Sequence, residues 1–178
     1  VKSPGIKIIN LFDDQWLRDE WQKVNAYHQS HLETVQLRFV ILAPSQSDLS
    51  YLERMCQLLE DEGLVDGAFK SRILNREQRQ STIFGNDIAF PHAINQASSQ
   101  TILILGLLEE TYQAEDKSVD FIFMVAISEQ LDNQTEIELL DLYDDIFRLA
   151  GNQSAKKDLK LIQTEEDFLA LAKSKGVF

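Results

Sequence analysis

Residues 75–93 read NREQRQSTIFGNDIAFPHA. Pro91 pushes Phe90 towards extended geometry and has no amide hydrogen to donate to a sheet, so an apolar strand over residues 88–90 should end there. His92 then stands at a strand end, with Arg76 on the preceding helical segment. An imidazole beside anion-binding guanidinium groups suits a nucleophile. The alternative is a histidine with only a core or surface role.

Working outward, apolar spacing predicts helices before and after a group of short strands. Ser50 and Glu53 fit a capping box, and Gly63 suits the position after that helix. Thr164 with Asp167 should open the last helix. The predicted helices cover residues 14–31, 50–62, 68–80, 137–150 and 164–171, and the predicted strands cover residues 37–42, 88–90, 101–107 and 121–127. This order predicts an α/β or α+β sandwich.

Length and composition fit one globular domain. The chain has 178 residues, of which 44% are hydrophobic and 26% charged. No apolar run approaches the roughly 18 residues of a membrane span, and no signal peptide is evident, so we expect a cytoplasmic protein without membrane insertion. The chain starts with Val1 rather than Met, which suggests a trimmed start.

The acidic charge is concentrated after the first 46 residues. Those residues carry five basic and five acidic side chains, so residues 47–178 hold the whole net charge of −12. Nucleic-acid binding needs a basic stripe, and the sequence has none. We therefore expect no direct contact with nucleic acid and a preference for basic protein partners.

Other chemical motifs have little support. The sequence lacks the GxGxxG, Walker A, HExxH and GxSxG patterns. His28 and His31 are spaced to share a helix face, but no third metal ligand is evident, so we predict no metal site. Cys56 lies on an apolar helix face and is expected to be a buried thiol.

Residues 75–93 resemble the signature of the fructose/mannitol-class EIIA domains of the bacterial phosphoenolpyruvate-dependent sugar phosphotransferase system, approximately R-E-x-x-x-S-T-x-x-G-x-x-I-A-x-P-H. The similarity extends from about residue 40 to the C-terminus, whereas residues 1–36 have no recognised counterpart. It implies a central mixed sheet of about five strands flanked by helices, without a cofactor. The matching residues are Arg76, Glu77, Ser81, Thr82, Gly85, Ile88, Ala89, Pro91 and His92.

The resemblance implies that His92 is a phosphohistidine phosphocarrier site. It would accept a phosphoryl group from the carrier protein HPr and pass it to an EIIB domain. Arg76 would hold phosphoryl oxygens, unless it only pairs with a helix neighbour. Ser81 and Thr82 would add hydroxyl donors, or would simply cap the turn after the helix. Gly85 is expected to serve the turn.

Glu136 departs from the family pattern. Many members carry a second histidine near the phosphoryl site, and the alignment places Glu136 there. A carboxylate would repel a phosphoryl group, although it could orient the His92 ring or raise its pKa. The alternative is that Glu136 only favours the N-terminus of its helix.

We therefore expect a helical leader or linker over residues 1–36 and an EIIA-like domain over residues 37–178. EIIA-like domains occur in sugar transporters and as regulatory modules of BglG-type transcription regulators and antiterminators. The leader and Glu136 favour the regulatory context, in which regulator domains would precede Val1. A transport EIIA and an interaction module that is not phosphorylated are the alternatives.

Overall fold

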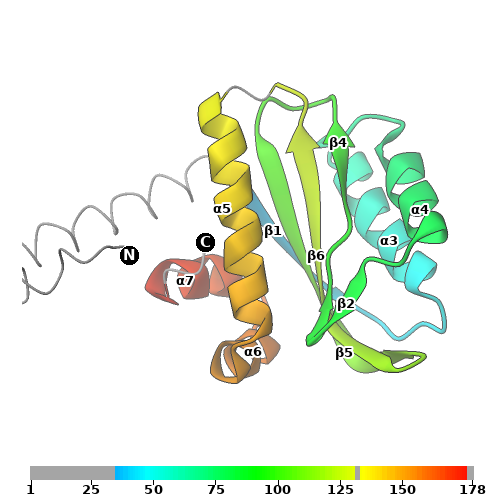
Figure 1. The fold of residues 1–178 in the computed structure, drawn as a ribbon, viewed down its shortest axis with the longest axis vertical. Helices are drawn as coiled ribbons and strands as arrows, with labels where there is room; N and C mark the ends of the chain where they lie inside the picture. The colour runs from blue at the N-terminus through cyan, green and yellow to red at the C-terminus, as the bar shows by residue number, and fades with distance from the viewer. Residues whose placement is uncertain (1–34, 131–132, 176–178) are drawn as a thin grey trace, which may run out of the picture.

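The computed structural model describes residues 35–130 and 133–175, which form one mixed sheet between two layers of helices (Figure 1). The strand order is β1-β5-β6-β3-β2, and β4 also pairs with β6. The β5–β6 and β2–β3 pairs are antiparallel, and the other pairs are parallel. The strands are β1 (Val35–Leu42), β2 (Ile83–Gly85), β3 (Asp87–Ala89), β4 (His92–Asn95), β5 (Thr101–Ala114) and β6 (Lys117–Ser128).

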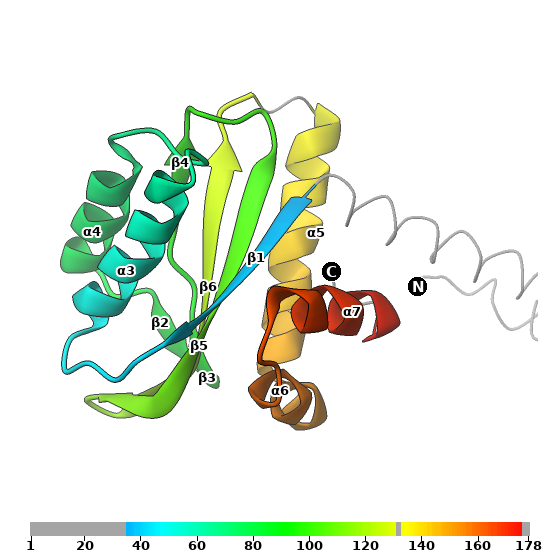
Figure 2. The ribbon, with the colours of Figure 1, turned by 180° about the vertical axis from the view of Figure 1, so that it is seen from behind.

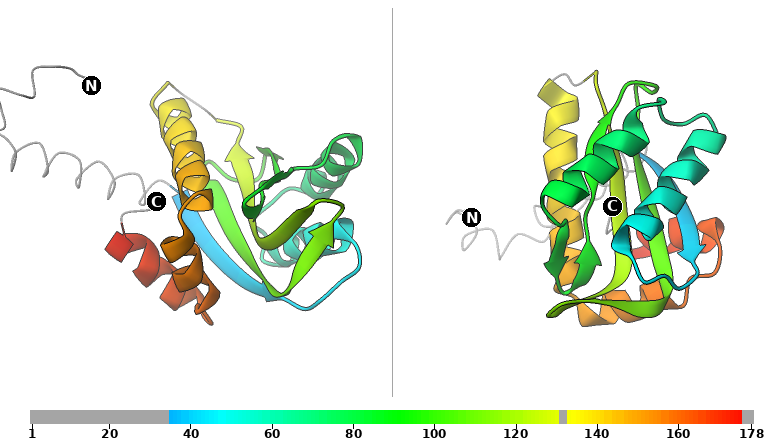
Figure 3. Two further views of the ribbon diagram at one scale, coloured as in Figure 1. Left: turned by 60° about the horizontal axis from the view of Figure 1, so that its bottom comes forward. Right: turned by 90° about the vertical axis from the view of Figure 1, so that its right-hand side faces the viewer.

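Helices cover both faces of the sheet, as the reverse and side views show (Figures 2 and 3). The first layer contains α3 (Asp48–Asp61) and α4 (Phe69–Arg79). The second contains α5 (Asn133–Ala150), α6 (Gln153–Lys160) and α7 (Glu165–Lys175). The predicted sandwich with a mixed sheet is confirmed. Because β3 and β4 follow one another along β6, the six strands occupy five positions.

The sheet separates two apolar cores, one under each helical layer. The side chains of residues 102–105 in β5 are fully buried, since that strand is covered on both faces. A strand that is buried on both faces has an uninterrupted apolar sequence, and this is why residues 101–107 were predicted as a strand. Cys56 is 1% exposed, as predicted, and burial raises the pKa of its thiol to about 12.

Helix ends were predicted with mixed success. The left-handed Gly63 ends α3, with Gly63 N–H donating to the Glu60 carbonyl (3.0 Å) and Leu64 N–H to the Leu59 carbonyl (2.9 Å). The Thr164 hydroxyl caps α7 by accepting from Asp167 N–H at 3.1 Å.

The capping box at Ser50 was wrong. Helix α3 already begins at Asp48, after Ser47, and the Ser50 hydroxyl accepts from the Arg54 guanidinium (3.2 Å) inside the helix. Ser47 has the extended backbone of an N-cap residue (φ −135°, ψ 130°), and the Tyr51 hydroxyl fixes the loop before it by accepting from Ser45 N–H at 2.8 Å.

Three short elements, β2, β4 and α6, were not predicted. The first strand begins at Val35, two residues before its expected start, and the strand expected over residues 88–90 covers Asp87–Ala89. The helix expected over residues 14–31 lies outside the described residues.

Candidate functional site

His92 lies just after the break between β3 and β4, two short strands that follow one another along β6. β3 and β4 pair with β6 in the same register, Ala89 opposite Ile122 and His92 opposite Val125. Across the break, the Pro91 carbonyl accepts from Val125 N–H at 3.0 Å. Proline lacks a donor but keeps its acceptor, so it stays attached to the sheet on this side. A strand does end before Pro91, as predicted, but His92 opens the next strand.

Aromatic rings hold the imidazole of His92. The half-buried ring stacks on Phe90, with centroids 5.0 Å apart and planes 29° apart, and lies 5.8 Å from the ring of Tyr143 in α5. Phe90 also meets Tyr143 edge to face at 4.9 Å. Burial raises the pKa of Tyr143 to about 12, so its hydroxyl stays neutral beside the histidine.

A hydrogen bond determines which nitrogen of His92 is protonated in the neutral ring. His92 Nδ1 lies 3.1 Å from the carbonyl oxygen of Phe90. A carbonyl oxygen can only accept, so Nδ1 carries the hydrogen and donates it. The lone pair of the neutral imidazole is therefore on Nε2.

The segment between α4 and β2 is held by a buried carboxylate. Glu77, 7% exposed, accepts from the Thr82 amide (2.7 Å) and hydroxyl (3.2 Å). Burial raises the pKa of Glu77, although the bonds from Thr82 oppose this. The Ser81 hydroxyl accepts from Ile83 N–H at 3.2 Å. The hydroxyls of Ser81 and Thr82 thus stabilise the turn after the helix, which was the alternative role proposed for them from the sequence. Gly85 has φ of 100°, which fits its expected turn role.

The structure does not join Arg76 or Glu136 to His92. Arg76 is exposed on α4, and within the described residues its side chain has no hydrogen bond or ion pair. Its contact with a phosphoryl group stays a prediction. Glu136 is exposed in the first turn of α5, two turns before Tyr143 and on the same side, which corresponds to about 10 Å along the helix axis.

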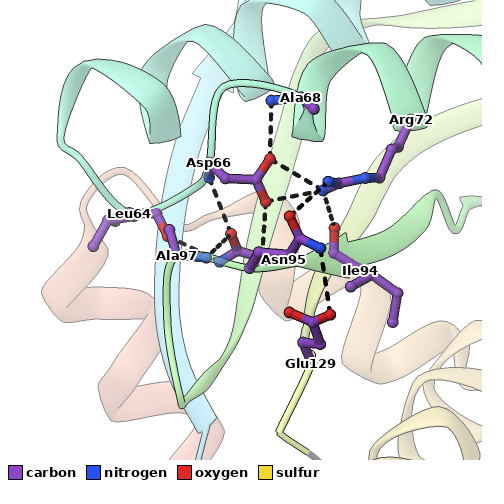
Figure 4. Close-up of polar contacts among 9 residues, drawn as sticks. Leu64, Asp66, Ala68, Arg72, Ile94, Asn95, Ala97 and Glu129 are labelled. Atoms are coloured by element: carbon purple, nitrogen blue, oxygen red, sulfur yellow. Dashed lines mark hydrogen bonds and ion pairs between the residues drawn. The ribbon is translucent and has the colours of Figure 1, made fainter.

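A polar network at the far end of β4 was not anticipated (Figure 4). Asn95, fully buried, accepts from the Asp66 and Ala97 amides, each at 3.1 Å, and donates to the Leu64 carbonyl at 2.9 Å. Arg72 pairs with Asp66 at 2.9 Å and donates to the Ile94 carbonyl at 2.8 Å. The network ties the strand that carries His92 to α4 and to the loop before it.

This network also perturbs the titration of Asp66. Burial alone would raise the pKa of its carboxyl group. Hydrogen bonds from Arg72 and from the amides of Gln96 and Ala68 outweigh burial and lower that pKa from 3.8 to about 2.

Within residues 35–130 and 133–175, no group of three or more His, Cys, Asp or Glu residues is arranged to hold a metal ion. His28 and His31 lie outside those residues. No helix among the described residues is long and apolar enough to cross a membrane.

Two characterised proteins of Bacillus subtilis (strain 168) are similar in sequence. The mannitol-specific phosphotransferase enzyme IIA component is 28% identical over 119 residues, which cover 65% of this chain and 78% of that protein. The transcriptional regulator ManR is 24% identical over 122 residues, which cover 65% of this chain but only 19% of the regulator. This chain therefore spans about a fifth of the length of that regulator.

Solved structures share the fold. IIA mannitol from Escherichia coli matches with a TM-score of 0.54 at 17% identity, covering 78% of this chain and 95% of that chain. The nitrogen regulatory protein IIA-Ntr from Neisseria meningitidis matches with a TM-score of 0.55 at 22% identity, covering 78% and 96%. The family profile described as "Phosphoenolpyruvate-dependent sugar phosphotransferase system, EIIA 2" matches residues 33–175, so this chain belongs to the EIIA type 2 family.

Proposed function

We propose that His92 is a phosphoryl acceptor, with phospho-HPr as donor or, alternatively, a phosphorylated EIIB domain. The observation that carries this proposal is the hydrogen bond from His92 Nδ1 to the Phe90 carbonyl, which leaves the lone pair on Nε2. In the transfer, the N–P bond of the donor phosphohistidine breaks and a new N–P bond forms at Nε2. The proton stays bonded to Nδ1 and hydrogen-bonded to the Phe90 carbonyl throughout.

The aromatic surroundings support this role. Stacking on Phe90 and contact with Tyr143 restrict the ring, so little rotational freedom is lost when the donor docks. Ile94, two residues along β4, is 39% exposed and adds apolar surface beside the histidine. The proposed role of Arg76 is to reach phosphoryl oxygens once the partner is bound.

The atom that accepts the phosphoryl group can be identified by NMR. Histidine labelled with ¹⁵N should show a protonated Nδ1 before the reaction and a phosphorylated Nε2 after incubation with phosphoenolpyruvate, enzyme I and HPr. A phosphoryl group on Nδ1, or a protonated Nε2 in the neutral ring, would contradict the assignment.

We further propose that the domain is a regulatory module of a BglG-type transcription regulator or antiterminator. The similarity to ManR and the presence of Glu136 support this context. Phosphorylation adds about −1.5 to −2 charges at pH 7, which is enough to change contacts with a neighbouring regulator domain. The role implies a cytoplasmic location and no direct contact of this domain with nucleic acid.

An EIIB domain is a proposed partner because the fold is shared with a solved complex. IIA mannitol of Escherichia coli, in its complex with phosphorylated IIB mannitol, matches with a TM-score of 0.55 at 16% identity. In the regulatory role, this exchange would report sugar flux to the rest of the protein.

The role of Glu136 is tested by Glu136→His. We expect faster phosphoryl transfer from this domain to an EIIB domain, because a carboxylate that repels the phosphoryl group is replaced by an imidazole. The matched control is Glu166→His, since Glu166 is also exposed in the first turn of a helix, α7. A rate that is unchanged or lower in Glu136→His would refute this role.

The second candidate is a transport EIIA component, which the mannitol-specific relative supports because this chain covers 78% of its length. Deleting the gene would then abolish uptake of one fructose- or mannitol-like sugar. Regulator domains encoded upstream in the same reading frame would instead support the regulatory role.

A further inference from the structure

Arg72 on α4 binds three other residues at once (Figure 4). Its Nη1 donates to both carboxylate oxygens of Asp66, at 3.1 and 2.9 Å, and to the Ile94 carbonyl at 2.8 Å. Its Nη2 donates to the side-chain carbonyl of Gln96 at 3.3 Å. Because a guanidinium group is planar and holds its donors in a fixed fork, these bonds fix α4 against the end of β4.

The Ile94 carbonyl lies on the edge of β4 that faces away from the sheet. Among the described strands, β4 pairs with β6 alone. The Pro91 carbonyl faces β6, because it accepts from Val125 N–H. Successive carbonyls alternate between the two edges of a strand, so the Ile94 carbonyl points away from β6. Arg72 gives that carbonyl the donor that a neighbouring strand would otherwise supply.

Helix α4 runs antiparallel to the segment from Phe90 to Gln96. Before the helix begins, Asp66 accepts from Gln96 N–H at 2.7 Å. After the helix ends, the Thr82 carbonyl accepts from Phe90 N–H at 3.0 Å. The bond from Arg72 to β4 lies between these two contacts. As the chain advances through α4, it therefore passes back along β4 towards the start of that strand.

This antiparallel arrangement brings Arg76 level with His92. Arg76 follows Arg72 by four residues, so it lies on the same face of α4 and about 6 Å further along the helix axis. On β4, His92 comes two residues before Ile94, which is about 6.6 Å along the strand. Because the helix and the strand run in opposite directions, the two steps lead the same way in space and have nearly the same length.

We propose that Arg72 is a positioning residue that holds Arg76 level with His92 for phosphoryl transfer. Arg72 does not itself bind the phosphoryl group, because both of its terminal nitrogens already donate to protein groups. It acts by fixing where α4 lies along β4. The inference rests on the proposed function, since it needs His92 as the acceptor and Arg76 as a ligand of the phosphoryl oxygens.

The single-turnover rate of transfer from phospho-HPr to Arg72→Lys tests the proposal. Lysine keeps the positive charge, but its flexible ammonium group cannot hold Asp66, Ile94 and Gln96 in one rigid arrangement. We expect the rate to fall by about tenfold, because a misplacement of about 1 Å can slow a reaction by about 100-fold. The matched control is Arg79→Lys, the same substitution at an exposed arginine in the last turn of α4, which should keep the wild-type rate.

A double-mutant cycle distinguishes positioning of Arg76 from general damage to the fold. Arg76→Ala should slow the transfer, and adding Arg72→Lys to it should slow the transfer no further, because Arg72 acts through Arg76. General damage would instead slow the transfer by the same factor with and without Arg76. If Arg72→Lys does not fold, Asp66→Asn gives a second test with the same expected pattern, because it weakens the hold on Arg72 and leaves that side chain in place.

Three results would overturn the inference when the wild type is phosphorylated on His92. The first is a rate for Arg72→Lys equal to that of Arg79→Lys. The second is the same fold-reduction by Arg72→Lys in the wild-type and Arg76→Ala backgrounds. The third is a wild-type rate in Arg76→Ala, since Arg76 would then not be a ligand of the phosphoryl group. A wild type that accepts no phosphoryl group would instead contradict the proposed function, and the inference would fall with it.

Discussion

Asp66→Asn is expected to destabilise the domain by loosening the attachment of β4. In the wild type, the Asp66 carboxylate accepts from Arg72 Nη1 (2.9 Å), Gln96 N–H (2.7 Å) and Ala68 N–H (2.9 Å). A pKa shift from 3.8 to about 2 corresponds to about 2.4 kcal/mol. Because Asp66 and Arg72 keep contact with water, we expect a loss of about 1–2 kcal/mol.

The stabilisation by Asp66 should decrease as the pH falls. The pKa of Asp66 is lower in the folded than in the unfolded chain, so its stabilisation is complete well above 3.8 and is lost as the pH falls towards about 2. The difference in unfolding free energy between wild type and Asp66→Asn should therefore fall to about half its neutral-pH value at about pH 3.

The assay is urea unfolding at both pH values, followed by far-UV circular dichroism because Trp16 and Trp21 both lie outside the described residues. The matched control is Asp116→Asn, which removes an exposed carboxylate in the β5–β6 turn. If Asp66→Asn costs no more than the control, or if its cost is the same at both pH values, the network does not contribute as argued.

Two further predictions concern the core. In Gly106→Ala, the new methyl group would lie 2.9 Å from both Leu42 Cδ1 and Met55 Sδ, so the substitution should lower the unfolding free energy by about 1–3 kcal/mol. The control is Gly67→Ala, which has nothing within 4 Å of the new methyl group and should cost less. Equal urea midpoints for the two variants would contradict the packing argument. The Cys56 thiol, with its pKa raised to about 12, should react with a thiol reagent at pH 8 only on unfolding, so rapid modification of the native protein would refute its burial.

Local signals predicted the elements that depend on their own residues. Gly63 ends its helix as expected, because that position needs a positive φ (71°), which glycine adopts without steric strain. The apolar runs of β5 and β6 were visible because both strands are buried over most of their length. The break at Pro91 followed from proline chemistry alone.

What the sequence did not reveal depends on partners that are distant along the chain. Helix α6 is short and polar, and Lys156 inside it is buried because its ammonium group reaches the Asn86 carbonyl (3.0 Å) and Asp87 (3.1 Å). No local pattern shows that pairing.

The same holds at the candidate site. The strand that begins with His92 forms only because β6 supplies its hydrogen-bonding edge, and Arg72 became relevant only when Asp66 and the end of β4 were placed beside it. Resemblance singled out His92 as a candidate, but the tautomer that leaves the lone pair on Nε2 could be assigned only from the Phe90 carbonyl at 3.1 Å from Nδ1.

The central claim, that His92 accepts a phosphoryl group, is tested most directly by intact-mass measurement of wild type and His92→Ala after incubation with phosphoenolpyruvate, enzyme I and HPr. The account predicts that the wild type gains one phosphoryl group, that acid removes it because phosphohistidine is acid-labile, and that His92→Ala gains none. An acid-stable adduct, an adduct that persists in His92→Ala, or no adduct with a validated cognate HPr and an EIIB domain would contradict it.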